Sequence, residues 1–409
     1  MRLRGRWVWA AAVLATLLVA ALALDACAAA TSGAAPTATR AATPSSRVSG
    51  PGAGRARVAW TAFAGDGVIQ VWTATSDGPP RLLATLAQAS ASCQMVAAGL
   101  PMLSPDGAHV LVSEGEQCGG LILDPGPLLV VDVASGQSRT VPLPYDATVL
   151  PQVRSYGWVD NRTVFAFSPK YNLEAAYRTY LYTLGAGQAA TLAGLDTPLE
   201  GVVRGSTLFY LQVTSGEGGI QSILRRYDLA QRTAIAGGID LGAYAACSEC
   251  PDMVISPGWD VAADGSHVVF QRTTPHPSGG IATSQIVYAR ADGGGEVQIA
   301  RYLATDAMAH LRLSPDGKRV AITAAYPSPA VITACVDTPG TRGDPCFATY
   351  RPDATSLAAW STDGRSFLAA TVDASYGRPT TDPGSLVRYT LGSATGQPIA
   401  VAYGPWSPP

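Results

Sequence analysis

Cysteines are the residues of this 409-residue sequence with the most chemistry to offer, and two of them form a Cys-x-x-Cys segment from Cys247 to Cys250. This spacing occurs in redox and zinc sites. A redox pair normally opens a helix, whose N-terminus stabilises the thiolate, but here Pro251 follows and no helical period surrounds the segment. A zinc site needs two further ligands, and the sequence contains no second pair of this kind. We therefore predict a local structural disulfide and no bound metal, with a redox or metal role as the alternative.

The other cysteines can be paired by their positions around turns. Cys93 and Cys118 stand equally far from the centre of a turn at 104–107, so the two segments leaving that hairpin should start close together. We predict a disulfide between them, located in loops beyond the strands. Cys335 and Cys346 enclose a loop rich in Pro and Gly and form the third predicted pair.

His310 is the histidine that most favours a ligand site. In the segment His310-Leu311-Arg312-Leu313, polar and apolar residues alternate, which is typical of a strand with one buried face. His310 and Arg312 then share a face and would point into a central channel if this strand is the innermost of its unit. We predict a candidate ligand site there, with a purely structural role as the alternative.

The N-terminus has the layout of an export signal. Arg2, Arg4 and Arg6 precede an uncharged apolar run over residues 7–24. The run ends in Leu-Asp-Ala-Cys, which resembles the bacterial lipobox and implies lipidation of Cys27; cleavage elsewhere and an uncleaved anchor are the alternatives. We predict a signal peptide over 1–27 and a flexible Ala/Ser/Thr/Pro linker over 28–55. The rest of the chain would lie outside the cytoplasm, where cysteines oxidise.

A turn followed by an apolar strand recurs along the rest of the chain. Ser-Pro-Asp-Gly stands at 104–107 and 314–317, with looser copies at 263–265 and 361–364 and weaker ones at 158–161 and 204–205. Ser, Pro and Gly suit the first, second and fourth positions of a type I turn. The spacing of about 50 residues suits a unit of four strands.

This motif resembles the TolB-like or WD40-like repeats of bacterial β-propellers. The resemblance implies an all-β, seven-bladed propeller over residues 56–409, with six or eight blades as alternatives. Strands expected at 57–63, 68–73 and 81–86 would share the first blade with a C-terminal strand near Trp406, which closes the ring.

Several further features bear on partners. Long connections at 87–99, 114–126, 171–178, 275–284 and 338–344 would carry a binding surface. The tryptophans at or near one repeat position are predicted to pack in the core first and to stack on sugars second: Trp158, Trp259, Trp360 and Trp406. Only two lysines are present, so no basic face for nucleic acid is expected.

The predicted function is non-enzymatic binding outside the cytoplasm by a membrane-anchored monomer without a cofactor. Its ligand would be a protein or glycan of the cell envelope. No Gly-x-Ser-x-Gly elbow or phosphate loop occurs in the sequence, and the repeat aspartates are explained by their turns. Two alternatives remain open: a propeller enzyme of lyase, lactonase or quinoprotein type with a site at the channel mouth, and an envelope assembly factor.

Overall fold

A computed structural model of the chain describes residues 57–398, and all of them belong to one compact part of the chain, Ser49–Pro409. The gaps in the description are 64–68, 76–78, 87–92, 98–100, 119–120, 145–154, 169–177, 196–197, 217–218, 245–256, 276–280, 304–309, 325–329, 336–347, 351–355, 362–363, 372–384 and 394. The predicted signal peptide, the lipidation site Cys27, the linker and Trp406 lie outside the described residues. They stay predictions.

Each element in the described residues is a β-strand, and the strands pair antiparallel within successive units. Unit 1 holds β1 (Arg57–Phe63), β2 (Ile69–Thr75) and β3 (Arg81–Thr85). Unit 2 holds β4 (Cys93–Ala97), β5 (Met102–Leu103), β6 (His109–Cys118), β7 (Leu121–Asp132) and β8 (Ser138–Thr140). Here β4 and β5 both pair with β6. Unit 3 holds β9 (Ser155–Trp158), β10 (Thr163–Ser168), β11 (Arg178–Thr183) and β12 (Ala190–Leu192).

Four more units follow. Unit 4 holds β13 (Pro198–Arg204), β14 (Thr207–Gly216), β15 (Gly219–Asp228) and β16 (Thr233–Tyr244). Unit 5 holds β17 (Trp259–Val261), β18 (His267–Pro275), β19 (Ile281–Arg290) and β20 (Val297–Leu303). Unit 6 holds β21 (His310–Leu313), β22 (Arg319–Ala324), β23 (Ala330–Cys335) and β24 (Ala348–Tyr350). Unit 7 holds β25 (Ser356–Trp360), β26 (Ser366–Thr371), β27 (Ser385–Thr390) and β28 (Gln397–Pro398).

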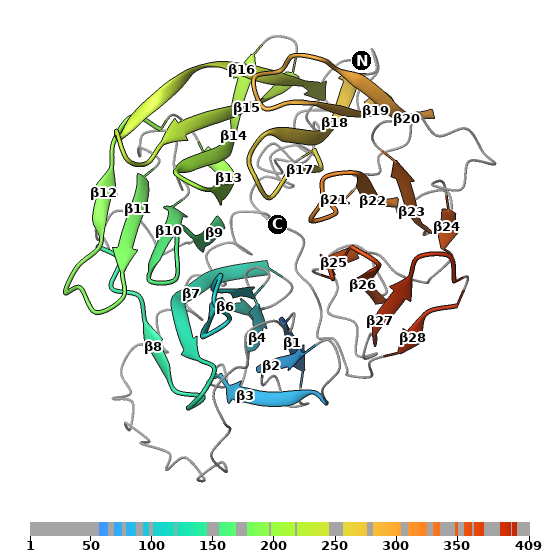
Figure 1. The fold of residues 1–409 in the computed structure, drawn as a ribbon. Coiled ribbons are helices and arrows are strands. Elements are labelled where there is room, and N and C mark those ends of the chain that lie inside the picture. Colours follow the sequence, from blue (N-terminus) through green and yellow to red (C-terminus); the bar gives the residue numbers. More distant parts are fainter. Residues whose placement is uncertain are drawn as a thin grey trace, which may run out of the picture. The chain divides into compact units, whose positions relative to one another are not determined.

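The units follow one another around a common centre (Figure 1). From unit 3 onward the first strand of each unit is innermost, and β8, β12, β24 and β28 lie at the periphery. Unit 1 has the three strands expected from the sequence, and β1 has the bounds predicted for it. The blade number and the closure by a C-terminal strand stay predictions, because residues 399–409 lie outside the described residues.

The core lies between successive units rather than within one sheet. The central strand β10 shows why: Val164 and Ala166 pack towards unit 2, whereas Phe165 and Phe167 pack towards unit 4. All four side chains are nearly inaccessible to solvent. A strand that buries both faces needs a continuous apolar run, and each buried Phe or Val contributes about 1.5–3 kcal/mol. This explains the apolar runs that follow the turns.

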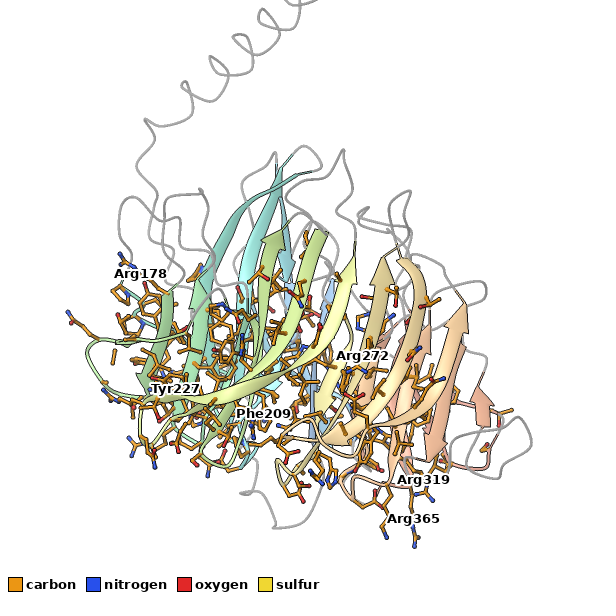
Figure 2. All side chains as sticks on the ribbon, turned by 90° about the horizontal axis from the view of Figure 1, so that it is seen from above. Arg178, Phe209, Tyr227, Arg272, Arg319 and Arg365 are labelled. Atoms are coloured by element: carbon orange, nitrogen blue, oxygen red, sulfur yellow. The ribbon has the colours of Figure 1, made fainter. Side chains whose placement is uncertain are left out.

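The Ser-Pro-Asp-Gly turns have the chemistry predicted for them. Ser314 Oγ donates a hydrogen bond of 2.6 Å to Asp316 Oδ1 and accepts one of 3.0 Å from the amide of Arg319. Gly317 N donates to the Ser314 carbonyl, 2.8 Å, and Gly317 has φ 67°, which a glycine adopts without strain. The turn at 104–107 repeats these contacts. Figure 2 shows Arg319, which follows the turn at 314–317, and Arg365, which follows the looser copy at 361–364, at one edge of the molecule. We call this edge the turn face.

Units 4 and 5 are joined directly by a contact that the sequence did not predict. The outer strand β16 continues beside β18 and pairs with it in parallel at Gly242 and Thr273. Gly242 has φ 89°, and a Cβ there would lie 2.0 Å from the Thr273 carbonyl oxygen. Only glycine permits this approach of the two backbones.

Some expected loops are strands. The segments 114–126 and 275–284, expected to be loops, contain the paired ends of β6 with β7 and of β18 with β19. Segment 87–99 contains β4, so the expectation that Cys93 and Cys118 lie beyond the strands is wrong: both are strand residues. Backbone pairing of neighbouring chain segments outweighed the Gly, Pro and polar content that suggested loops.

Candidate binding site on the inner strands

Four polar side chains gather on the inner strands of units 4 to 6. They are Arg204 at the end of β13, Asp260 in β17, and His310 and Arg312 in β21. We call them the inner-strand cluster. In β21 the burial alternates, with Leu311 and Leu313 buried and His310 and Arg312 half-buried, as the sequence pattern predicts.

Asp260 connects three successive units. Its Oδ2 accepts a hydrogen bond of 2.8 Å from the amide of Leu313 in unit 6, and its Oδ1 accepts one of 2.9 Å from the amide of Val261. Oδ1 also lies 3.6 Å from Nη2 of Arg204 in unit 4. A carboxylate offers several acceptor sites. Asp260, which is buried, is therefore occupied by these contacts.

Arg204 is held between its own unit and the next. Its Nε donates to the Val261 carbonyl, 3.2 Å, and its Nη1 donates to the Val203 carbonyl, 3.2 Å. Burial lowers the pKa of Arg204, Asp260 counteracts this, and the positive charge of Arg312 lowers the pKa further. Asp260 is thus the counter-charge of Arg204, and Arg312 adds a second positive charge that acts on it.

Arg312 uses little of its hydrogen-bonding capacity within the protein. In the described part of the chain its Nη1 donates to the carbonyl of the adjacent Leu311, 3.0 Å. A guanidinium has further N–H donors, in a planar fork suited to carboxylate or phosphate. Beside it, burial and the charge of Arg312 lower the pKa of His310 to about 4. His310 is therefore neutral at physiological pH.

Two tryptophans connect the inner strands of adjacent units. Trp158 Nε1 donates to the Met102 carbonyl, 2.9 Å, and Trp360 Nε1 donates to the Arg312 carbonyl, 2.8 Å. Trp259 is buried but its Nε1 has no hydrogen-bond partner among the described residues. Packing, the first prediction for these residues, is confirmed for Trp158 and Trp259, whose side chains are too buried to stack on a sugar.

Sequence reasoning singled out His310 and Arg312 but missed Arg204 and Asp260. A positional signal was available for Asp260: it stands two residues before the first residue of its turn, as Arg312 stands two before Ser314. Arg204 directly precedes its turn glycine. Turn alignment would have shown that these polar side chains occur on successive inner strands. Whether the cluster binds a ligand stays a prediction.

The backbone places one predicted cysteine pair directly opposite. Cys93 in β4 faces Cys118 in β6 in the antiparallel register. Cys335 ends β23, whereas Cys346, Cys247 and Cys250 lie outside the described residues. The disulfides stay predictions.

Two kinds of feature are absent from the described residues. No group of His, Cys, Asp or Glu side chains there is arranged to hold a metal ion. No helix there is long and apolar enough to cross a bilayer.

Comparison with known proteins supports the fold. The Kuenenia stuttgartiensis hydrazine synthase matches over 81% of this chain and 95% of that chain, with 12% identity and a TM-score of 0.53. The Dos1 propeller matches over 82% of this chain and 76% of its own chain, with 10% identity and a TM-score of 0.46. The chain is a β-propeller, because its antiparallel units follow one another around a common centre (Figure 1). TolB from Acinetobacter baumannii matches over 69% of this chain and 61% of its own chain, with 15% identity and a TM-score of 0.41. No protein-family profile and no curated sequence matches the chain.

Proposed function

We propose that this propeller is a non-enzymatic binding module outside the cytoplasm, held at the membrane by its N-terminal segment, whose ligand presents an anionic group to Arg312. The ligand belongs to a protein or glycan of the cell envelope. The observation that carries the proposal is the guanidinium of Arg312, which among the described residues donates only to the Leu311 carbonyl and whose positive charge acts on Arg204. Asp260 is paired with Arg204, so the charge of Arg312 favours an added anion.

Binding is favoured over catalysis by how the titratable groups are used. Both oxygens of Asp260 accept backbone hydrogen bonds, one from Val261 within unit 5 and one from Leu313 in unit 6. The carboxylates of Asp106 and Asp316 accept hydrogen bonds inside their own turns. A His310 with a pKa of about 4 is a weak base at neutral pH. These groups serve the architecture rather than proton transfer.

The location outside the cytoplasm is supported by the N-terminal sequence and the six cysteines that follow Cys27. An envelope assembly factor would share this location and this mode of binding. It differs only in what the bound partner does next.

The test compares envelope crosslinking of the wild-type protein with that of Arg312→Gln. We expect the specific crosslinked product to fall at least about tenfold in Arg312→Gln, since loss of a charge-assisted bidentate contact costs about 1.5–3 kcal/mol. Lys318→Gln is the matched control, because Lys318 is an exposed cation on the turn face. Equal products from wild type and Arg312→Gln would contradict the proposal. A stoichiometric metal in the purified protein together with substrate turnover would favour the enzyme alternative.

A further inference from the structure

The two halves of the inner edge of unit 2 differ in register, and this difference places two cysteines face to face. In β5, Met102 faces Leu111 of β6, and in β4, Cys93 faces Cys118 of the same strand. If the β5 register continued unchanged, Met95 would face Cys118. The chain between β5 and β4 thus shifts the pairing by two residues, and only the shifted pairing brings the cysteines opposite one another.

We propose that Cys93 and Cys118 form a disulfide that links the inner strand β4 to the end of β6. Directly opposed residues of an antiparallel pair have Cα atoms about 4.5 or 5.5 Å apart. A disulfide needs Cα atoms about 4.4–6.8 Å apart, so both kinds of opposed pair satisfy it without movement of the backbone. This inference is independent of which ligand the propeller binds.

The end of β6 is also the part of unit 2 that most needs a crosslink. Its ladder with β7 shifts register between Ser113 and Gly115 and again between Glu116 and Gln117. Gly115 faces Pro125, which has no amide hydrogen to donate. On its other side, β6 is paired there with β4, a strand of five residues. A bond between Cys93 and Cys118 would close this weakly paired region.

The chemistry is thiol–disulfide exchange. One thiolate attacks a disulfide of an oxidant, either an envelope dithiol–disulfide oxidoreductase or oxidised glutathione, and a mixed disulfide forms. The second thiolate then attacks the protein sulfur of that mixed disulfide and displaces the thiol. The two cysteines lose two protons and two electrons in total, and the oxidant is reduced to its dithiol or to two molecules of reduced glutathione.

A related pattern occurs at the predicted pair of Cys335 and Cys346. In the β23–β24 ladder Thr333 faces Ala348. The same register counted two positions further would pair Cys335 with Cys346. Residue 346 lies outside the described residues, so this pair remains the prediction made from the sequence and serves as an internal comparison in the experiment.

The experiment uses the full chain, reduced and then equilibrated with a buffer of oxidised and reduced glutathione. Free thiols are blocked before digestion with trypsin. The sequence contains no Lys or Arg between Arg81 and Arg139, so Cys93 and Cys118 fall in one tryptic peptide that holds no other cysteine. We expect this peptide to lack the blocking group and to be lighter than the reduced peptide by two hydrogens. Cleavage after Glu114 and Glu116 should then give two cysteine-containing fragments that separate only on reduction.

The result that overturns the proposal is a blocked Cys93 or Cys118, or a link from either of them to another cysteine. Hydrogen exchange gives a second measurement that needs no variant. Reduction should speed amide exchange in 93–97 and 114–118 at least several-fold more than in β14, which serves as the reference. Uniform acceleration of amide exchange over all strands, or no acceleration in these two segments, would also contradict a disulfide between Cys93 and Cys118.

Discussion

Replacement of Asp260 tests whether one buried carboxylate holds units 4, 5 and 6 together. Asp260→Ala leaves the amides of Leu313 and Val261 without their acceptor and removes the counter-charge of Arg204. A buried donor left unsatisfied costs about 1–3 kcal/mol, and breaking a buried ion pair costs about 3–5 kcal/mol. Arg204 retains two carbonyl partners and is 28% exposed, so we expect the lower part of this range, about 3–4 kcal/mol in total.

The assay is urea unfolding followed by tryptophan fluorescence. The matched control is Asp264→Ala, which removes an exposed carboxylate whose contacts stay within its own turn at Ser266. We expect this control to lose less than about 1 kcal/mol. A double-mutant cycle of Asp260→Ala with Arg204→Met should give a coupling of about 1 kcal/mol or more. The reasoning is refuted if Asp260→Ala is no more destabilising than Asp264→Ala.

Three further predictions concern stability. Trp360→Phe should cost about 1–2 kcal/mol more stability than Trp259→Phe in the same assay. The Trp360 indole donates a hydrogen bond to the Arg312 carbonyl, whereas the buried Trp259 Nε1 lacks a partner in the described residues. Equal losses for the two variants would contradict this. Because the pKa of His310 is low, the unfolded chain takes up a proton between about pH 6.5 and pH 4 that the folded chain does not. The stability due to the neutral imidazole is therefore complete above that window and is lost on acidification. From about pH 7 to pH 5 we expect a decrease of about 1–2 kcal/mol, absent in His310→Gln, and unchanged pH dependence in that variant would disprove the assignment. Gly242→Ala should destabilise the protein by about 2 kcal/mol more than Gly237→Ala. Both glycines have positive φ, but only at Gly242 would a Cβ meet the Thr273 carbonyl. Similar losses at the two positions would show that the β16–β18 contact adjusts freely.

Local chemistry in the sequence predicted the repeating parts of this fold. The side chains of Ser104 and Asp106 make hydrogen bonds with neighbours within five positions, so these bonds follow from the sequence itself. The alternation in His310 to Leu313 likewise requires only that β21 has one buried face.

Contacts between units could not be predicted in this way. The bond from Leu313 to Asp260 spans 53 positions, and the pairing of Gly242 with Thr273 depends on how two whole units pack. The pairing of Cys93 with Cys118 was predicted from the centre of the turn at 104–107. Yet β5 leaves that turn in a different register, and β4 recovers the predicted pairing only through the shift between the two strands.

The most direct test of binding at the inner strands uses a photo-crosslinking residue at two matched exposed positions. Met102 is 37% exposed on β5, which pairs with the inner side of β6 in unit 2. Leu82 is 41% exposed on β3, which lies at the periphery (Figure 1). We expect an envelope partner to be captured from position 102 and not from position 82, with the capture lost when Arg312→Gln is added. Capture from position 82 alone, or capture from position 102 that persists in Arg312→Gln, would contradict binding at the inner strands.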